Sequence, residues 1–130
     1  QKKRKMLKRS PIKKLSEKQR VKNREKAEQT KKRFEMFLEI WEERKEYSPK
    51  FGYFCRCFET GDILREYYYK ENSCVYHHLL EKNPYPEYDL LKENIVLLHP
   101  DIHSQVHTDI DKTPKVKKAT QELLNKLRNE

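Results

Sequence analysis

The sequence predicts an α+β fold, and three observations lead to that prediction. Residues 16–47 contain neither glycine nor proline and consist mostly of strong helix formers. Two further helices are expected to begin at Pro100 and Pro114, since proline is favoured at the first position of a helix. Between these helices, short segments bounded by turn residues are expected to be strands. Their ranges are 53–58, 74–78 and 95–98.

The long helix predicted over 16–47 has two different halves. Ser16 is the expected N-cap, and Glu17 follows in the first turn, where a negative charge is favourable. The first half is almost wholly polar and cannot pack on a core by itself. In the second half, apolar residues follow the i, i+3, i+4, i+7 pattern of a helix that packs on a body. These residues are Phe34, Phe37, Leu38 and Trp41.

The net charge of +9 is concentrated at the start of the chain. Residues 1–33 carry 16 Lys/Arg against 3 Asp/Glu, whereas the remaining residues carry 14 against 18. Residues 1–15 contain Pro11 and have no helical period, so we expect a flexible basic arm that becomes ordered on nucleic acid. The basic residues expected to bind nucleic acid are Lys2, Lys3, Arg4, Lys5, Lys8, Arg9, Lys13, Lys14, Lys18, Arg20, Lys22 and Arg24.

The composition predicts a small core and a reducing environment. Charged residues make up 39% of the chain and hydrophobic residues 35%, and small cores often need a metal or a partner. No segment approaches the ~20 apolar residues of a membrane span, and no apolar region follows the basic N-terminal residues as in a secretory signal. Three cysteines do not form an even disulfide set. We therefore expect a cytoplasmic protein with no membrane partner.

All five histidines fall within 31 residues, in an order that predicts a metal site. His77 and His78 are adjacent at the end of an expected strand, and His99, His103 and His107 recur every fourth residue on one helix face. Phosphodiester hydrolysis needs a base to activate water and a cation at the phosphate. One histidine of the pair, with His103 and His107, provides three neutral ligands that leave the charge of the cation uncancelled.

These residues, together with Asn94, resemble the HNH, or ββα-metal, nuclease motif. Asn94 stands nine residues before His103 and thirteen before His107, which is the spacing found in that family. The DNase colicins have a similar His-His pair. The resemblance implies that His78 is the general base, that Asn94 holds the loop against it, and that His77, His103 and His107 bind one divalent ion.

The resemblance also implies a domain organisation and a role. The ββα-metal nuclease core would span 51–112. The basic arm ahead of it is similar to those of small phage HNH proteins such as the NinG/Rap recombination nucleases, which would place the chain in a bacterial host cell. The expected function is metal-dependent nicking or cutting of duplex or branched DNA, in recombination or DNA processing.

A C-terminal amphipathic helix is expected over 113–130. Thr113 is the predicted cap and Pro114 the first helical residue. The apolar face of this helix consists of Val116, Ala119, Leu123 and Leu127.

The metal is expected to be Mg, Mn, Zn or Ni, and three imidazoles favour the borderline ions among them. Many HNH domains also carry two Cys-x-x-Cys pairs for structural zinc. Here Cys55 and Cys57 are one residue too close, and His99 and Ile102 stand where the second pair would fall. Structural zinc is therefore not expected, and these cysteines with Cys74 should be small buried hydrophobes. His99 should be a helix cap or a hydrogen-bond donor to a ligand.

Two other functions are compatible with the sequence. The chain could be a non-catalytic DNA- or RNA-binding component of a phage packaging or recombination assembly that keeps the ββα fold. It could also be a structural zinc protein. The polar helix surface over 17–33 is available to a second copy of the chain or to such an assembly. Several tyrosines either pack in the body or stack on bases. They are Tyr67, Tyr68, Tyr69, Tyr85 and Tyr88.

Overall fold

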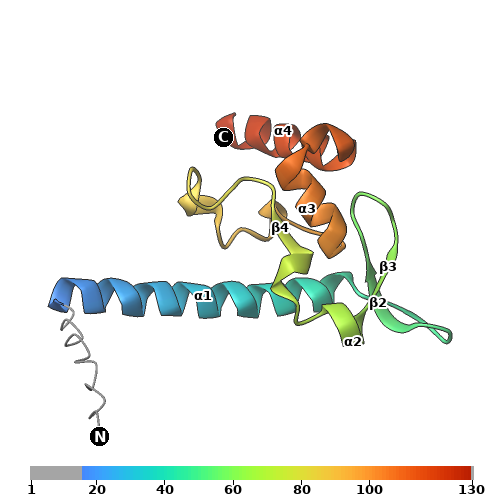
Figure 1. The fold of residues 1–130 in the computed structure, drawn as a ribbon, viewed down its shortest axis with the longest axis horizontal. Helices are drawn as coiled ribbons and strands as arrows, with labels where there is room; N and C mark the ends of the chain where they lie inside the picture. The colour runs from blue at the N-terminus through green and yellow to red at the C-terminus, as the bar shows by residue number, and fades with distance from the viewer. Residues whose placement is uncertain (1–15, 130) are drawn as a thin grey trace, which may run out of the picture.

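The computed structural model describes residues 16–129, and its longest element is the first helix (Figure 1). This helix, α1, spans Glu17–Arg44. It begins where the sequence predicts, because the Ser16 hydroxyl accepts a hydrogen bond from the Gln19 N–H at 3.1 Å. Its first half is almost wholly exposed and extends beyond the body of the molecule in Figure 1. The arm expected over 1–15 lies outside the described residues.

The helix ends at Arg44, earlier than the predicted end at Tyr47. Lys45 is extended, and Tyr47 instead lies in strand β1 (Glu46–Ser48), opposite Tyr53. Tyrosine fits well in strands, and the two rings meet with their centroids 5.1 Å apart. This cross-strand contact replaces the last helical turn that the composition predicts.

The side of α1 that packs on the body differs in part from the predicted stripe. Phe34 remains 37% exposed and Leu38 is only half-buried, because the helix meets the body along the line of Ile40 and Trp41. Both of these residues are fully buried. The buried residues of α1 are Met36, Phe37, Ile40 and Trp41.

A three-stranded antiparallel sheet follows α1, in the order β1-β2-β3. The strand β2 (Gly52–Arg56) corresponds to the one predicted over 53–58, whereas β1 and β3 (Ile63–Arg65) were not expected. Gly52 and Gly61 have φ angles of +69° and +77°, which glycine adopts without strain, and each directly follows the turn that connects two strands of this sheet. The short helix α2 (Glu66–Tyr69) continues from β3.

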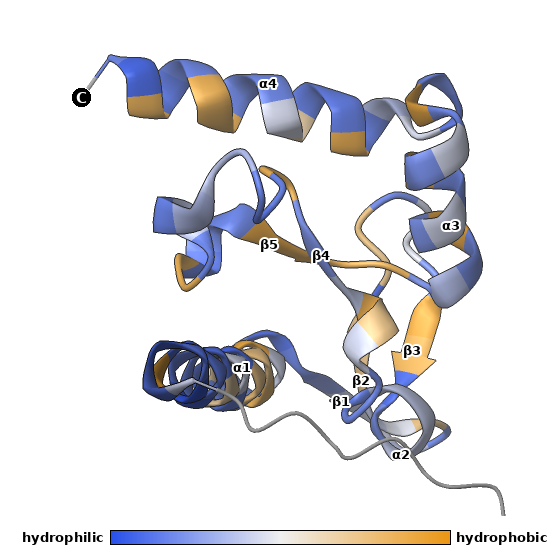
Figure 2. Cartoon of the chain, turned by 60° about the vertical axis from the view of Figure 1, so that its left-hand side comes forward, coloured by the Kyte–Doolittle hydropathy of each residue, from blue (hydrophilic) through white to orange (hydrophobic). Residues whose placement is uncertain are grey.

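A second, two-stranded sheet lies at the centre of the molecule (Figure 2). Strand β4 (Tyr76–His78) pairs antiparallel with β5 (Ile95–Leu97). The prediction that β4 starts at Cys74 is wrong, because Ser73–Val75 form a 3-10 turn in which the Asn72 side chain accepts a hydrogen bond from the Cys74 N–H at 3.0 Å. Between the two strands, Pro86–Tyr88 and Lys92–Asn94 form short 3-10 turns within the expected loop.

Two helices complete the chain: α3 (Pro100–Thr108) and α4 (Pro114–Arg128). Both start with proline as predicted, and a 3-10 turn joins them over Ile110–Lys112. Thr113 is at the N-cap position of α4, as predicted, but its side chain makes no capping hydrogen bond. The cap comes from the Glu59 carboxylate, which accepts hydrogen bonds from the N–H groups of Lys115 at 3.3 Å and Val116 at 2.9 Å.

The apolar face of α4 turns toward the two-stranded sheet, as its orange residues show in Figure 2. Val116 and Leu123 are buried, and Ala119 and Leu127 are partly buried against the core. The fold is therefore α+β, with a long N-terminal helix, two small antiparallel sheets and a C-terminal helix. Within residues 16–129, no helix combines the length and the apolar character needed to cross a membrane.

Candidate functional site

The structure brings together the three histidines that the sequence predicts as metal ligands. His77 comes from β4, and His103 and His107 come from successive turns of α3. The ring centroids are 4.9 Å apart for His77–His103 and for His103–His107, and 5.6 Å apart for His77–His107. One ligand atom from each ring lies within 4.8 Å of the others, so the three side chains could hold a metal ion.

The hydrogen bonds and protonation of these rings suit a metal. The Nδ1–H of His103 donates to the Cys74 carbonyl at 2.5 Å, which leaves the Nε2 lone pair free. In the described part of the chain, the rings of His77 and His107 have no hydrogen-bond partner. Burial, followed by the neighbouring histidines, lowers the pKa of His77 to about 3, and burial also lowers the pKa of His103. Neutral imidazole is the form that binds metal, so His77 and His103 are in the metal-binding form at neutral pH.

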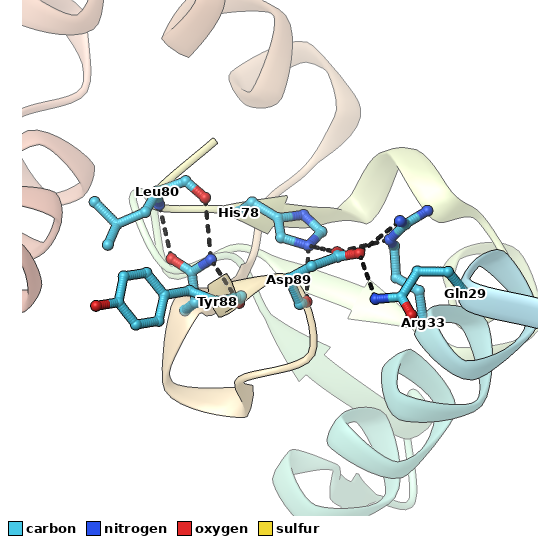
Figure 3. A network of polar contacts seen from close by, with 7 residues as sticks. Gln29, Arg33, His78, Leu80, Tyr88 and Asp89 are labelled. Atoms are coloured by element: carbon cyan, nitrogen blue, oxygen red, sulfur yellow. Dashed lines mark hydrogen bonds and ion pairs between the residues drawn. The ribbon is translucent and has the colours of Figure 1, made fainter. Parts of the chain in front are cut away.

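His78, the predicted general base, lies beside this group and is held by Asp89 (Figure 3). Its Nε2 is 2.9 Å from the Asp89 carboxylate and 3.2 Å from the Asp89 carbonyl oxygen. Both partners are acceptors, so the proton is on Nε2 and Nδ1 carries the lone pair. Burial lowers the pKa of His78, and the Asp89 hydrogen bond opposes this effect. A neutral His78 can therefore accept a proton at Nδ1.

Asp89 and its partners on α1 were not predicted from the sequence. Arg33 makes two hydrogen bonds to the Asp89 carboxylate, at 2.7 and 2.6 Å, and Gln29 donates a third at 3.1 Å. Although burial raises the pKa of Asp89, these donors outweigh it and lower that pKa to about 2. The carboxylate thus stays charged. One signal did exist: Arg33 is one turn before the buried Phe37, on the face of α1 that meets the body.

Asn94 holds the loop that carries Asp89. Its side chain is fully buried, and its carbonyl oxygen accepts a hydrogen bond from the Leu80 N–H at 2.7 Å. Its amide nitrogen donates to the carbonyl oxygens of Leu80 at 3.0 Å and Tyr88 at 3.2 Å (Figure 3). The residue joins the two ends of the loop over 80–88, next to Asp89. This is a positioning arrangement, and Asn94 does not line the cavity described next.

A cavity of about 460 Å³ contains both parts of the site. It lies between the second half of α1 and the strand β4. Lys82 and Arg33 provide positive charge at its wall, Glu81 provides a carboxylate, and Phe34 and Phe37 provide apolar surface. The histidines that line it are His77, His78, His103 and His107.

His99 is separate from the metal group, as the sequence predicts. Its Nδ1 accepts a hydrogen bond from the Asp101 N–H at 3.1 Å, so His99 is the N-cap of α3. Cys55 and Cys57 are buried as expected, and burial raises the pKa of Cys55 to about 12. The expectation that Cys74 is buried is wrong, because the turn before β4 places it on the surface.

The predicted nucleic-acid contacts fall in two places. Lys18, Arg20, Lys22 and Arg24 are exposed on the projecting half of α1. The other eight basic residues belong to 1–15 and lie outside the described residues.

No protein-family model matches the chain, and no curated protein and no solved structure matches it significantly.

Proposed function

We propose that the chain is a metal-dependent endonuclease of the HNH type, which hydrolyses phosphodiester bonds in DNA. The observation that carries this proposal is a single cavity. It is lined by the three-histidine metal group and by a fourth histidine, His78, which is hydrogen-bonded to the charged carboxylate of Asp89. A metal group and a base are the two components that phosphodiester hydrolysis requires. The order β4, β5, α3, with the histidines on β4 and α3, supports the HNH assignment.

Each residue of the site has a separate role in the proposed hydrolysis. His78 Nδ1 takes a proton from the water that attacks phosphorus. The Nε2–H continues to donate its hydrogen bond to Asp89, so the negative carboxylate stabilises the imidazolium that forms. Arg33 keeps that carboxylate ionised and fixed in place. His77, His103 and His107 would hold a divalent cation, which supplies positive charge at the phosphate and at the leaving oxygen.

Lys82 is the side chain that we assign to the phosphate. It lines the same cavity, and among residues 16–129 it makes no ion pair or hydrogen bond. Arg33, the other cation of the cavity, is already bound to Asp89. Lys82 is also in the loop that Asn94 fixes. The exposed basic residues of α1 would bind the DNA backbone outside the cavity.

The test is cleavage of supercoiled plasmid by the purified protein with Mg, Mn, Ni or Zn, and with EDTA as the control. We expect cleavage that needs a metal and that falls by roughly 10²-fold or more in His78→Ala. His99→Asn is the matched control, since it removes a histidine outside the metal group but keeps an acceptor that caps α3. The ratio of nicked to linear product then shows whether one strand or two are cut.

Two results would contradict the proposal. One is cleavage by His78→Ala at the wild-type rate. The other is tight, salt-sensitive DNA binding without cleavage for every ion, which would instead favour a non-catalytic DNA-binding component.

A further inference from the structure

Four exposed tyrosines lie on the three-stranded sheet and α2, and three of them line a hollow. Tyr47 is 65% exposed, Tyr53 48%, Tyr67 90% and Tyr68 64%. The hollow has a volume of about 330 Å³ and is lined by Tyr53, Tyr67 and Tyr68, with Arg65 and Glu66 among them. Single exposed aromatic residues are common, but a group of them around one hollow marks a binding surface. We call these four side chains the tyrosine face.

Two cations at the tyrosine face have no carboxylate partner. The Arg65 guanidinium lies 5.1 Å from the centroid of the Phe51 ring, and Lys50 Nζ lies 5.2 Å from it. In the described part of the chain, neither cation forms an ion pair. The neighbouring cations differ in this respect, because Lys45, Arg56 and Lys70 are each bound to a glutamate. Exposed rings with unpaired cations beside them suit a ligand that has flat bases and phosphates.

A series of ring contacts runs from the tyrosine face to His99 at the start of α3. The centroids of Tyr67 and Tyr68 are 5.1 Å apart, those of Tyr68 and Tyr69 6.4 Å, and those of Tyr69 and His99 5.6 Å. His99 caps α3, the helix that carries His103. A strand that leaves the histidine cavity past this cap would therefore meet the tyrosine face.

We propose that the tyrosine face stacks on unpaired bases of a DNA strand whose backbone enters the histidine cavity. This inference rests on the proposed function and specifies its substrate, which is duplex DNA with a single-stranded segment beside the cut. Bases within a duplex stack on one another, so exposed rings select unpaired ones. Arg65 and Lys50, which form no ion pair among the described residues, provide positive charge beside the rings, and this charge suits the phosphates of a nucleic acid.

The test measures binding rather than cutting. A blunt duplex and the same duplex with a single-stranded overhang are titrated with the protein in EDTA, with 2-aminopurine in the overhang. We expect tighter binding of the overhang substrate and quenching of the 2-aminopurine fluorescence. The double variant Tyr67→Ala/Tyr68→Ala should bind the overhang substrate about fivefold to 10²-fold more weakly and the blunt duplex as before. Tyr67→Phe/Tyr68→Phe should bind as the wild type does, because the rings remain.

Phe58→Ala is the control for loss of an exposed aromatic side chain outside the tyrosine face, since Phe58 is 40% exposed. Equal binding of blunt and overhang substrates, or unchanged binding by the Tyr→Ala double variant, would overturn this inference and would leave the tyrosine face to a protein partner. Because EDTA prevents metal-dependent cleavage, the binding titration is independent of the cleavage assay with added metal. A protein that binds the overhang in EDTA but does not cut DNA when metal is added would disprove only the nuclease proposal. A protein that cuts blunt and overhang substrates alike would disprove only the inference.

Discussion

Asp89 connects the long helix α1 to His78, the proposed general base. It is 5% exposed, and its carboxylate binds Arg33 and Gln29 of α1 on one side and His78 of β4 on the other (Figure 3). Burying a carboxylate is costly unless it is fully paired, and these donors provide that pairing. The helix therefore helps to set the protonation and orientation of His78, in addition to carrying exposed basic residues on its projecting half.

The variant Asp89→Asn should lower the cleavage rate by roughly 10²-fold. The amide has no negative charge to stabilise the imidazolium, and its NH₂ group can face His78 and force the proton onto the wrong nitrogen. Metal binding, measured by calorimetry, should not change, because Asp89 does not touch the metal group. Glu87→Gln, an exposed change in the same loop, is the control. Full activity in Asp89→Asn would show that the carboxylate has no part in the reaction.

The lowered pKa of the Asp89 carboxylate predicts how the stability of the fold depends on pH. The pKa of Asp89 falls from 3.8 to about 2 on folding, so ionised Asp89 contributes about 2 kcal/mol of stability above pH ~4. That contribution should disappear as the pH falls from about 4 through about 2. The measurement is urea unfolding of the wild type and of Asp89→Asn over this range. The stability difference between them should shrink toward low pH, and a constant difference would contradict the assignment.

At the scale of elements, local signals in the sequence predict the starts of helices well. Ser16 ahead of α1 and the prolines at the start of α3 and α4 are such signals, because capping is decided within a few residues. The histidine spacing on α3 is equally local. The metal group was therefore predictable once β4 was placed beside that helix.

Contacts between distant segments were not predictable. The Arg33–Asp89 pair joins residues 56 positions apart, and Glu59 caps α4 from a turn that lies 57 positions before Val116. Neither partner stands out in its own segment, because Arg33 is one of many cations in α1. The end of α1 depends on the pairing of Tyr47 with Tyr53 across two strands. Helix propensity describes each residue by itself and takes no account of such a pairing. The same reason explains why β1 and β3 were missed.

The basic residues on the projecting half of α1 should bind DNA by contacting its phosphates. The double variant Lys18→Gln/Lys22→Gln should weaken binding and reduce the slope of log K against log[salt] by up to about two, if both lysines reach phosphates. Lys115→Gln/Lys118→Gln on α4 removes the same charge from exposed positions on another helix and is the matched control. Equal effects of the two pairs would mean that only net charge matters and that α1 has no specific role.

At the scale of the whole molecule, the core is an apolar cluster, and we expect it to form without a metal. Buried residues from α1, β2, β4, β5 and α4 form one cluster, whereas His103 and His107 lie outside it. The protein should therefore remain folded in EDTA, as shown by circular dichroism and a cooperative thermal transition. This result would separate a catalytic metal from a structural one, since a zinc-dependent fold would unfold on chelation.

Adding Ni or Zn to the metal-free protein should then raise its melting temperature through binding alone. At a hundredfold excess over Kd, the added stability is about 2.7 kcal/mol, which corresponds to roughly 10 °C for a chain of this size. His103→Ala should abolish the shift, because it removes a ligand atom. His78→Ala should keep the shift, because His78 belongs to the Asp89 pair and not to the metal group. A variant that loses cleavage but keeps the metal shift would thus separate the base from the ligands, and loss of the shift in both variants would mean that the two parts are one site.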